Sequence, residues 1–148
     1  MPAAVPPARD GYALVVECEP DPRDLSLLEE RLAEAAIEAV GAGDEHEFGI
    51  FVRDDDGRVA AGASGSIWGG GCQIHALWVD KRLRDRGVAR ALMAEAEAEA
   101  RRHGCRIVMG LTYDVLTADF YDRLGYHTVG TIDDCPAGTT TRWYRKDL

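Results

Sequence analysis

The stretch of the chain best suited to chemistry lies near its middle, where a predicted strand ends and a predicted helix begins. Such a junction presents free backbone N–H groups at the positive end of a helix, and small residues let an anion approach them. The small residues here are Gly87 and Ala89. The stretch therefore predicts a phosphate or pyrophosphate site, and its alternative is an exposed helix start without a ligand. Its basic side chains are Lys81, Arg82, Arg84, Arg86 and Arg90.

The spacing in this segment excludes two familiar phosphate loops. No Gly-Lys-Ser/Thr follows, so the segment is not a Walker loop. Two of the three glycines of a dinucleotide fingerprint are missing. The acidic triplet Asp54–Asp56 precedes Gly57, and Asp-Gly is a strong hairpin signal, so we expect a solvated turn there and no metal site anywhere.

Apolar periodicity and turn residues predict the elements that position this segment. We expect a mixed α/β (α+β) sheet of about seven strands with helices on both faces. Residues 1–9 read as a loose N-terminal tail, and 10–148 as a single domain. The predicted helices are 22–40, capped by Asp21 and stopped by Gly41, then 87–103 and 117–124. The predicted strands are 12–19, 48–52, 59–68, 72–79, 106–111, 126–132 and 140–146.

Composition narrows the class of protein. Hydrophobic residues make up 46% of the 148 residues and charged residues 29%, which is typical of globular chains. A net charge of −9 disfavours nucleic acid and anionic membranes as partners. No apolar run is long enough for a membrane helix, and the first residues do not resemble a secretory signal. The four cysteines show no CxxC spacing, so we expect free, mostly buried thiols and a cytoplasmic protein.

Two motifs in the correct order resemble the GNAT superfamily of N-acetyltransferases. Arg84-Asp-Arg-Gly87-Val-Ala89 matches the signature Arg/Gln-x-x-Gly-x-Gly/Ala, and a Leu-x-Val strand precedes it. Phe120-Tyr121-Asp-Arg-Leu-Gly125-Tyr126 matches the downstream Phe-Tyr-x-x-x-Gly-Tyr/Phe motif. The resemblance covers about residues 10–148. It implies a GNAT fold whose sheet splays between the fourth and fifth predicted strands.

The resemblance also implies acetyl-CoA as the donor substrate and no metal. The pantetheine arm would pair with Leu77, Trp78 and Val79, and the N–H of Val79 would polarise the thioester carbonyl. The pyrophosphate would lie on the backbone of Arg84, Asp85, Arg86, Gly87, Val88, Ala89 and Arg90.

Two side chains are candidates for proton transfer by the same resemblance. Tyr121 corresponds to the tyrosine that acts as general acid near the sulfur, although a tyrosine that only packs is the alternative. His75 lies where members carry a base or hold a water, and a histidine bonded in the groove is the alternative. Asp114 stands where many members have Asn, which puts cofactor contacts from that loop in question. Cys72 and Cys135 read as small hydrophobic residues rather than nucleophiles.

The implied function is transfer of an acetyl group to a primary amine of a small molecule, directly within a ternary complex. Three alternatives stay open: a longer acyl-CoA as the donor, acetylation of a protein N-terminus or lysine, and an idle acyl-CoA-binding sensor. Overall acidity, with Asp133 and Asp134, suggests a cationic acceptor. A homodimer is expected, with Trp143 and Tyr144 as aromatic residues suited to its interface.

Overall fold

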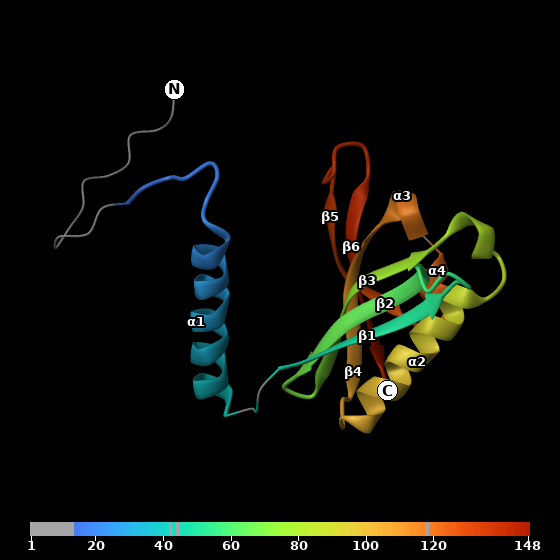
Figure 1. The fold of residues 1–148 in the computed structure, drawn as a ribbon, viewed down its shortest axis with the longest axis horizontal. Coiled ribbons are helices and arrows are strands. Elements are labelled where there is room, and N and C mark those ends of the chain that lie inside the picture. The colour runs from blue at the N-terminus through green and yellow to red at the C-terminus, as the bar shows by residue number, and fades with distance from the viewer. Residues whose placement is uncertain (1–13, 42, 44, 118) are drawn as a thin grey trace. The chain divides into compact units, whose positions relative to one another are not determined.

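The computed structural model describes residues 14–41, 43, 45–117 and 119–148, without the side chains of residues 115 and 117 (Figure 1). The described residues fall into two compact units, divided after Gly41. The single domain expected over residues 10–148 stays a prediction. No helix in the described part of the chain is long and apolar enough to cross a membrane.

The first unit contains helix α1 (Pro22–Val40), as predicted. The carboxylate of Asp21 accepts a hydrogen bond from the N–H of Arg23, and proline occupies the first turn. Gly41 ends the helix with a φ of 69°, and its N–H donates to the carbonyl of Ile37. The strand expected at 12–19 is not formed over residues 14–19, and residues 12–13 lie outside the described ones.

The second unit is built on a sheet with the order β1-β2-β3-β4-β6-β5. Among the described residues it has six strands rather than about seven, and all neighbours pair antiparallel except β3 and β4. A register shift against Ser64 and Gly65 leaves one extra residue in β3. The strands are β1 (His46–Arg53), β2 (Val59–Trp68), β3 (Gly71–Val79), β4 (Ile107–Tyr113), β5 (His127–Asp133) and β6 (Thr140–Asp147).

Strands β3 and β4 separate within the sheet. They pair over only four positions, from Gly71 with Ile107 to Ile74 with Gly110. Beyond that point β3 remains paired with β2, and β4 remains paired with β6. The expected splay is therefore present, and it leaves one edge of β3 open in the middle of the sheet.

Helices of the second unit pack on the sheet and connect its halves. A short 3-10 helix, η1 (Lys81–Leu83), and helix α2 (Val88–Arg102) follow β3, and α3 (Asp114–Thr117) and α4 (Phe120–Arg123) follow β4. The helix predicted at 117–124 thus corresponds to α4. Helices α2 and α4 share one core with the sheet; a helix on the second face stays a prediction. That core includes Ile74, Met93, Ala96, Val108, Tyr121, Tyr126 and Tyr144.

The two aromatic residues expected at an interface have different surroundings. Tyr144 is 2% exposed and belongs to the core, so its expected interface role is wrong. Trp143 is 38% exposed. Adjacent side chains in a strand point to opposite faces of the sheet, so only one of the two could face the core.

A buried carboxylate connects α2 to the last strands. Glu97 accepts a hydrogen bond of 3.0 Å from the Tyr126 hydroxyl. Lys146 of β6 donates to both of its oxygens at 2.9 Å. An uncompensated buried charge is costly, and this pairing compensates it while fixing how α2 lies on the sheet.

A second charged pair fixes α3 to β6. Arg142 donates from Nε and Nη2 to the two oxygens of Asp114 at 2.7 and 2.8 Å, and from Nη1 to Thr128 at 3.0 Å. Hydrogen bonding to Arg142 holds the pKa of Asp114 below its ordinary value. A carboxylate with a lowered folded-state pKa stabilises the fold above its unfolded pKa, and the contribution is lost as pH falls through the folded value.

We therefore expect Asp114→Asn to lower the urea midpoint at neutral pH, and the deficit to shrink as pH falls below the unfolded value of about 3.9. Urea denaturation of both proteins across this range measures the difference. Asp55→Asn, in the exposed hairpin turn, is the control and should change little. A deficit that stays constant into strong acid would contradict the ionic origin of the pair.

Candidate active site

The loop between β3 and α2 is held by its own first residue. Asp80 accepts a hydrogen bond from the N–H of Arg82 at 2.9 Å and pairs with the Arg82 Nε at 2.9 Å. These bonds lower the pKa of Asp80 to about 2. The carboxylate thus stays ionised and fixes η1 directly after the strand.

The start of α2 has the features of an anion site. Gly87 has a φ of 77°, and no side chain caps the helix or places an acid in its first turn. The first bond of the helical series runs from the N–H of Ala91 to the carbonyl of Gly87. The N–H groups of Val88, Ala89 and Arg90 precede it and have no helical acceptor. Among the described residues, Lys81, Arg86 and Arg90 form no ion pair within 4.0 Å.

The open edge of β3 leads to this helix start. The N–H of Asp80 donates to the carbonyl of Ala60 in β2. Successive N–H groups of a strand alternate in direction, so the N–H of Val79 points away from β2 and towards the gap. The carbonyl of Val79 accepts a hydrogen bond of 3.1 Å from the Arg84 side chain. Another chain that paired here would compete with Arg84 for that carbonyl.

His75 lies at the bulge where β3 turns away from β4. It is the extra residue in the register, between Ile74 and Ala76. Its Nε2 lies 3.1 Å from the hydroxyl of buried Ser66. Ser66 precedes the core residue Ile67, so Ser66 and His75 lie on the face opposite the core. The imidazole is exposed there, so a second molecule has access to it.

Tyr121 lies on the other face, within a cluster of three tyrosines. Its ring stacks on Tyr144 with centroids 3.9 Å apart and meets Tyr126 edge-on at 5.7 Å. Burial raises the pKa of Tyr121, and a hydrogen bond with the Tyr144 hydroxyl acts in the opposite direction. A Cβ at Gly110 would overlap the Tyr144 hydroxyl. Gly110 is the last β4 residue paired with β3, so this hydroxyl lies at the mouth of the gap.

Asp114 and Cys72, which the sequence also singled out, have surroundings that point to structural roles. Both oxygens of Asp114 bind Arg142, a contact across 28 residues that no sequence motif signals. Burial raises the pKa of the Cys72 thiol to about 12, which makes it a poor nucleophile. The expectation of mostly buried thiols holds for Cys72 and Cys105 but is wrong for Cys18 and Cys135.

The two acidic residues expected near the acceptor, Asp133 and Asp134, form hydrogen bonds with nearby residues of the chain. Asp133 accepts a hydrogen bond from the Thr140 hydroxyl at 3.2 Å, and Asp134 accepts one from the N–H of Gly138 at 2.8 Å. Both carboxylates are thus bonded within their own segment of the chain and are not free ligands.

The structure thus brings together a basic helix start, an open strand edge and a histidine along residues 75–90. Tyr121 stacks on Tyr144, whose hydroxyl lies at the same gap on the core side. Such an arrangement can hold an extended phosphate-bearing molecule along β3. It also offers a proton acceptor on one face of the sheet and a phenol on the other.

Comparisons with known proteins identify the family. The model of the Acetyltransferase (GNAT) family matches residues 9–126. Acetyltransferase Atu2258 of Agrobacterium fabrum is 32% identical over 109 residues, which is 72% of this chain and 77% of that protein. Blasticidin-S acetyltransferase of Streptomyces morookaense is 32% identical over 102 residues, which is 68% of this chain and 75% of that protein.

A solved structure confirms the fold. A crystal structure of a protein from Agrobacterium tumefaciens, assigned as an acetyltransferase, superposes with a TM-score of 0.86 and 26% identity. The match covers 93% of this chain and 100% of that one. The splayed mixed sheet, the signature loop and these relatives agree, and the chain belongs to the GNAT acetyltransferase family.

Proposed function

We propose that this protein transfers the acetyl group of acetyl-CoA directly to a primary amine of a small molecule. The observation that carries the proposal is the open edge of β3, which ends at the uncapped, basic start of α2. An extended thioester with a pyrophosphate fits both parts at once. Strand-like pairing would hold its arm, and helix N–H groups would hold its charge.

The cofactor would be held by residues on the two sides of η1. Leu77, Trp78 and Val79 offer the open edge for the pantetheine arm, and Arg84 would release the Val79 carbonyl to it. The backbone from Arg84 to Arg90, including Asp85, would hold the pyrophosphate. The unpaired side chains of Lys81, Arg86 and Arg90 would add positive charge. Asp114 is bound to Arg142, so it would support this site by fixing α3 rather than by touching the cofactor.

Transfer requires a polarised carbonyl, a deprotonated amine and a protonated thiolate. The N–H of Val79, which points into the gap, would donate to the thioester oxygen. His75 on the exposed face would take the proton of the amine directly or through water. Tyr121 would donate to the departing sulfur from the core side. Burial raises its pKa, so the phenol carries its proton at neutral pH.

The acceptor class is supported by the relatives and by charge. One relative at 32% identity is named for blasticidin S, a small molecule. A net charge of −9, with Asp133 and Asp134 in the last loop, favours a cationic amine.

Exposed free thiols at Cys18 and Cys135 favour a cytoplasmic location. Exposed Trp143 remains available for a homodimer interface, which light scattering would detect.

Release of CoA from acetyl-CoA, measured with a panel of amines, tests the function. The panel includes aminated nucleosides, aminoglycosides, polyamines and peptides with free N-termini. Turnover with small amines supports the proposal. Turnover with peptides alone replaces it by protein acetylation, and tight acetyl-CoA binding without any turnover replaces it by a sensor role.

We expect Gly87→Glu to abolish measurable acetyl-CoA binding in calorimetry. The side chain would place a negative charge beside the N–H groups that bind the pyrophosphate. Gly104→Glu is a matched control, because Gly104 has a similar φ of 73° and similar open space at the far end of α2. The control therefore carries the same backbone strain and should bind normally. Equal affinities in the two folded variants would remove the pyrophosphate from the start of α2.

We expect Tyr121→Phe to lower kcat by at least about 100-fold, the range of general acid catalysis, with little change in the Kd for acetyl-CoA. Tyr126→Phe removes a hydroxyl from the same aromatic cluster. It should reduce stability, because the Glu97 bond is lost, and keep turnover. Rapid-quench measurements of the chemical step provide the comparison. A chemical step at the wild-type rate in Tyr121→Phe would leave solvent as the proton source.

A further inference from the structure

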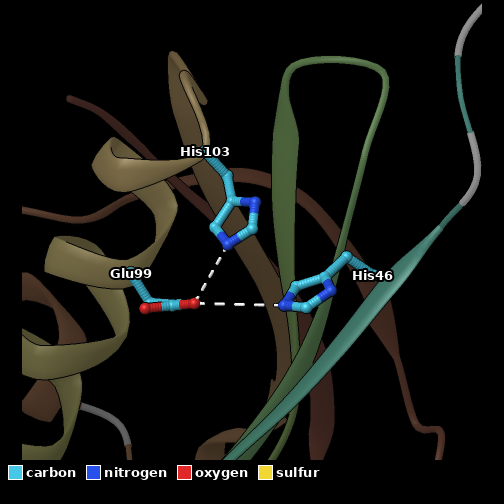
Figure 2. A group of neighbouring side chains, drawn as sticks. All are labelled: His46, Glu99 and His103. Atoms are coloured by element: carbon cyan, nitrogen blue, oxygen red, sulfur yellow. Dashed lines mark hydrogen bonds and ion pairs between the residues drawn. The ribbon is translucent and has the colours of Figure 1, made fainter.

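Two histidines and one glutamate from distant parts of the chain meet at the far end of α2. Glu99 lies in the last turns of α2, and His103 caps the helix four residues later, so their side chains share one face. His46 is the first residue of β1, one of the two edge strands of the sheet. Figure 2 shows both imidazoles turned towards the same carboxylate oxygen. No sequence motif assigns a functional role to these histidines.

The distances suit a small divalent cation. Nε2 of His103 lies 3.1 Å from Oε1 of Glu99, and Nε2 of His46 lies 4.0 Å from the same oxygen. The potential ligand atoms of all three residues lie within 4.8 Å of one another. Ligands about 2.0–2.1 Å from a tetrahedral Zn²⁺ are separated by about 3.4 Å. Small rotations of side chains would therefore bring the three atoms around one ion.

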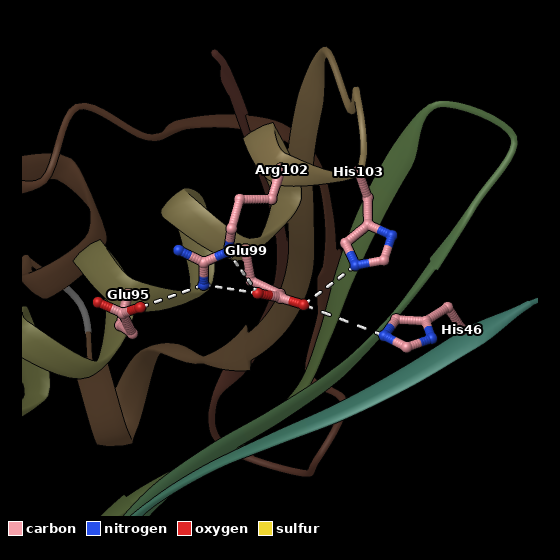
Figure 3. A network of polar contacts seen from close by, with 5 residues as sticks. All are labelled: His46, Glu95, Glu99, Arg102 and His103. Carbon is pink, nitrogen blue, oxygen red and sulfur yellow. Dashed lines mark hydrogen bonds and ion pairs between the residues drawn. The ribbon is translucent and has the colours of Figure 1, made fainter.

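The neighbours of Glu99 favour binding of a cation through its Oε1 atom. Arg102 donates from Nε to the other oxygen, Oε2, at 2.8 Å and pairs with Glu95 at 3.2 Å (Figure 3). Arg102 therefore orients the Glu99 carboxylate and leaves Oε1 to the histidines. The charge of Arg102 is offset by Glu95.

The two imidazoles are arranged as neighbouring ligands. Their rings stack with centroids 4.5 Å apart at an angle of 24°. Side-chain exposures of 52% for His46, 38% for His103 and 22% for Glu99 leave the site open to ions from solvent. Both rings need only carry their proton on Nδ1 to present a free Nε2.

We propose that His46, Glu99 and His103 form a Zn²⁺ site with water as the remaining ligand. Imidazole nitrogen and carboxylate oxygen are suitable zinc ligands, and three protein ligands leave one tetrahedral position open. The ion would cross-link the start of β1 to the end of α2. A helix of 15 residues is about 22 Å long, so the ion would lie far from the predicted pyrophosphate site. Zinc binding therefore requires neither acetyl-CoA nor turnover.

Calorimetric titration of the chelator-treated full chain with Zn²⁺ tests the proposal. We expect one saturable site and a rise in the melting temperature, because the ion binds the folded state. His46→Ala, His103→Ala and Glu99→Gln should each weaken binding by at least about tenfold, since loss of even an outer-shell partner costs that much. His127→Ala removes an exposed histidine of β5 and should bind as the wild type does.

A double variant, Cys18→Ser with Cys135→Ser, guards against binding by exposed thiols. It should retain the site. NMR signals of the His46 and His103 rings should shift on saturation with Zn²⁺, whereas those of His127 should not. The proposal is overturned if no heat appears up to about 1 mM Zn²⁺, the limit of a weak site. It is equally overturned if the thiol variant loses binding or the three ligand variants keep it.

Discussion

The separation of β3 from β4 after four paired positions is the constraint on which the rest of the structure depends. It divides the sheet into β1-β2-β3 and β4-β6-β5, which share only the short parallel contact from Gly71 to Ile74. Unpaired strand edges are normally protected, because they expose backbone donors and acceptors. Here Arg84 binds one carbonyl of the open edge, at Val79. Helix α2 contacts strands of both halves and holds them together where backbone bonds do not.

The same separation explains why the basic loop lies where it does. Strand β3 ends beside the gap, and the chain turns through η1 and the positive φ values of Asp85 and Gly87 before α2 begins. The first N–H groups of α2 therefore lie close, along the chain, to the open edge. The chain has a net charge of −9, so the local excess of arginine here makes a positive patch on an otherwise negative surface. Such a patch attracts an anionic ligand to this point.

The sequence predicted features that depend on local chemistry and missed those that depend on distant contacts. The bounds of helix α1 follow from Asp21 and Pro22 at its start and from Gly41 at its end, all of which act on the neighbouring residues of the chain. The apolar run Leu14–Val16 has strand propensity, but no partner strand follows from a single sequence, and the described residues form no strand there.

Pairs separated by many residues had no signal that one sequence could reveal. Lys146 meets Glu97 across 49 residues and Arg142 meets Asp114 across 28. Glu99 and His103 show helical spacing, but His46 joins them only because β1 lies beside α2. Strand alternation allows only one of Trp143 and Tyr144 to face the core. Which of the two is buried depends on the register with β4.

The raised pKa of Tyr121 constrains the role that it can have in the proposed reaction. A thiol has a pKa of about 8.5 and a phenol one of about 10, so transfer of a proton from tyrosine to a free thiolate is uphill even before burial adds to the difference. Tyr121 would therefore act while the carbon–sulfur bond breaks, by giving its proton to the charge that develops on sulfur rather than to a free thiolate. The Tyr144 hydroxyl would favour that donation, because its hydrogen bond opposes the rise in pKa that burial causes.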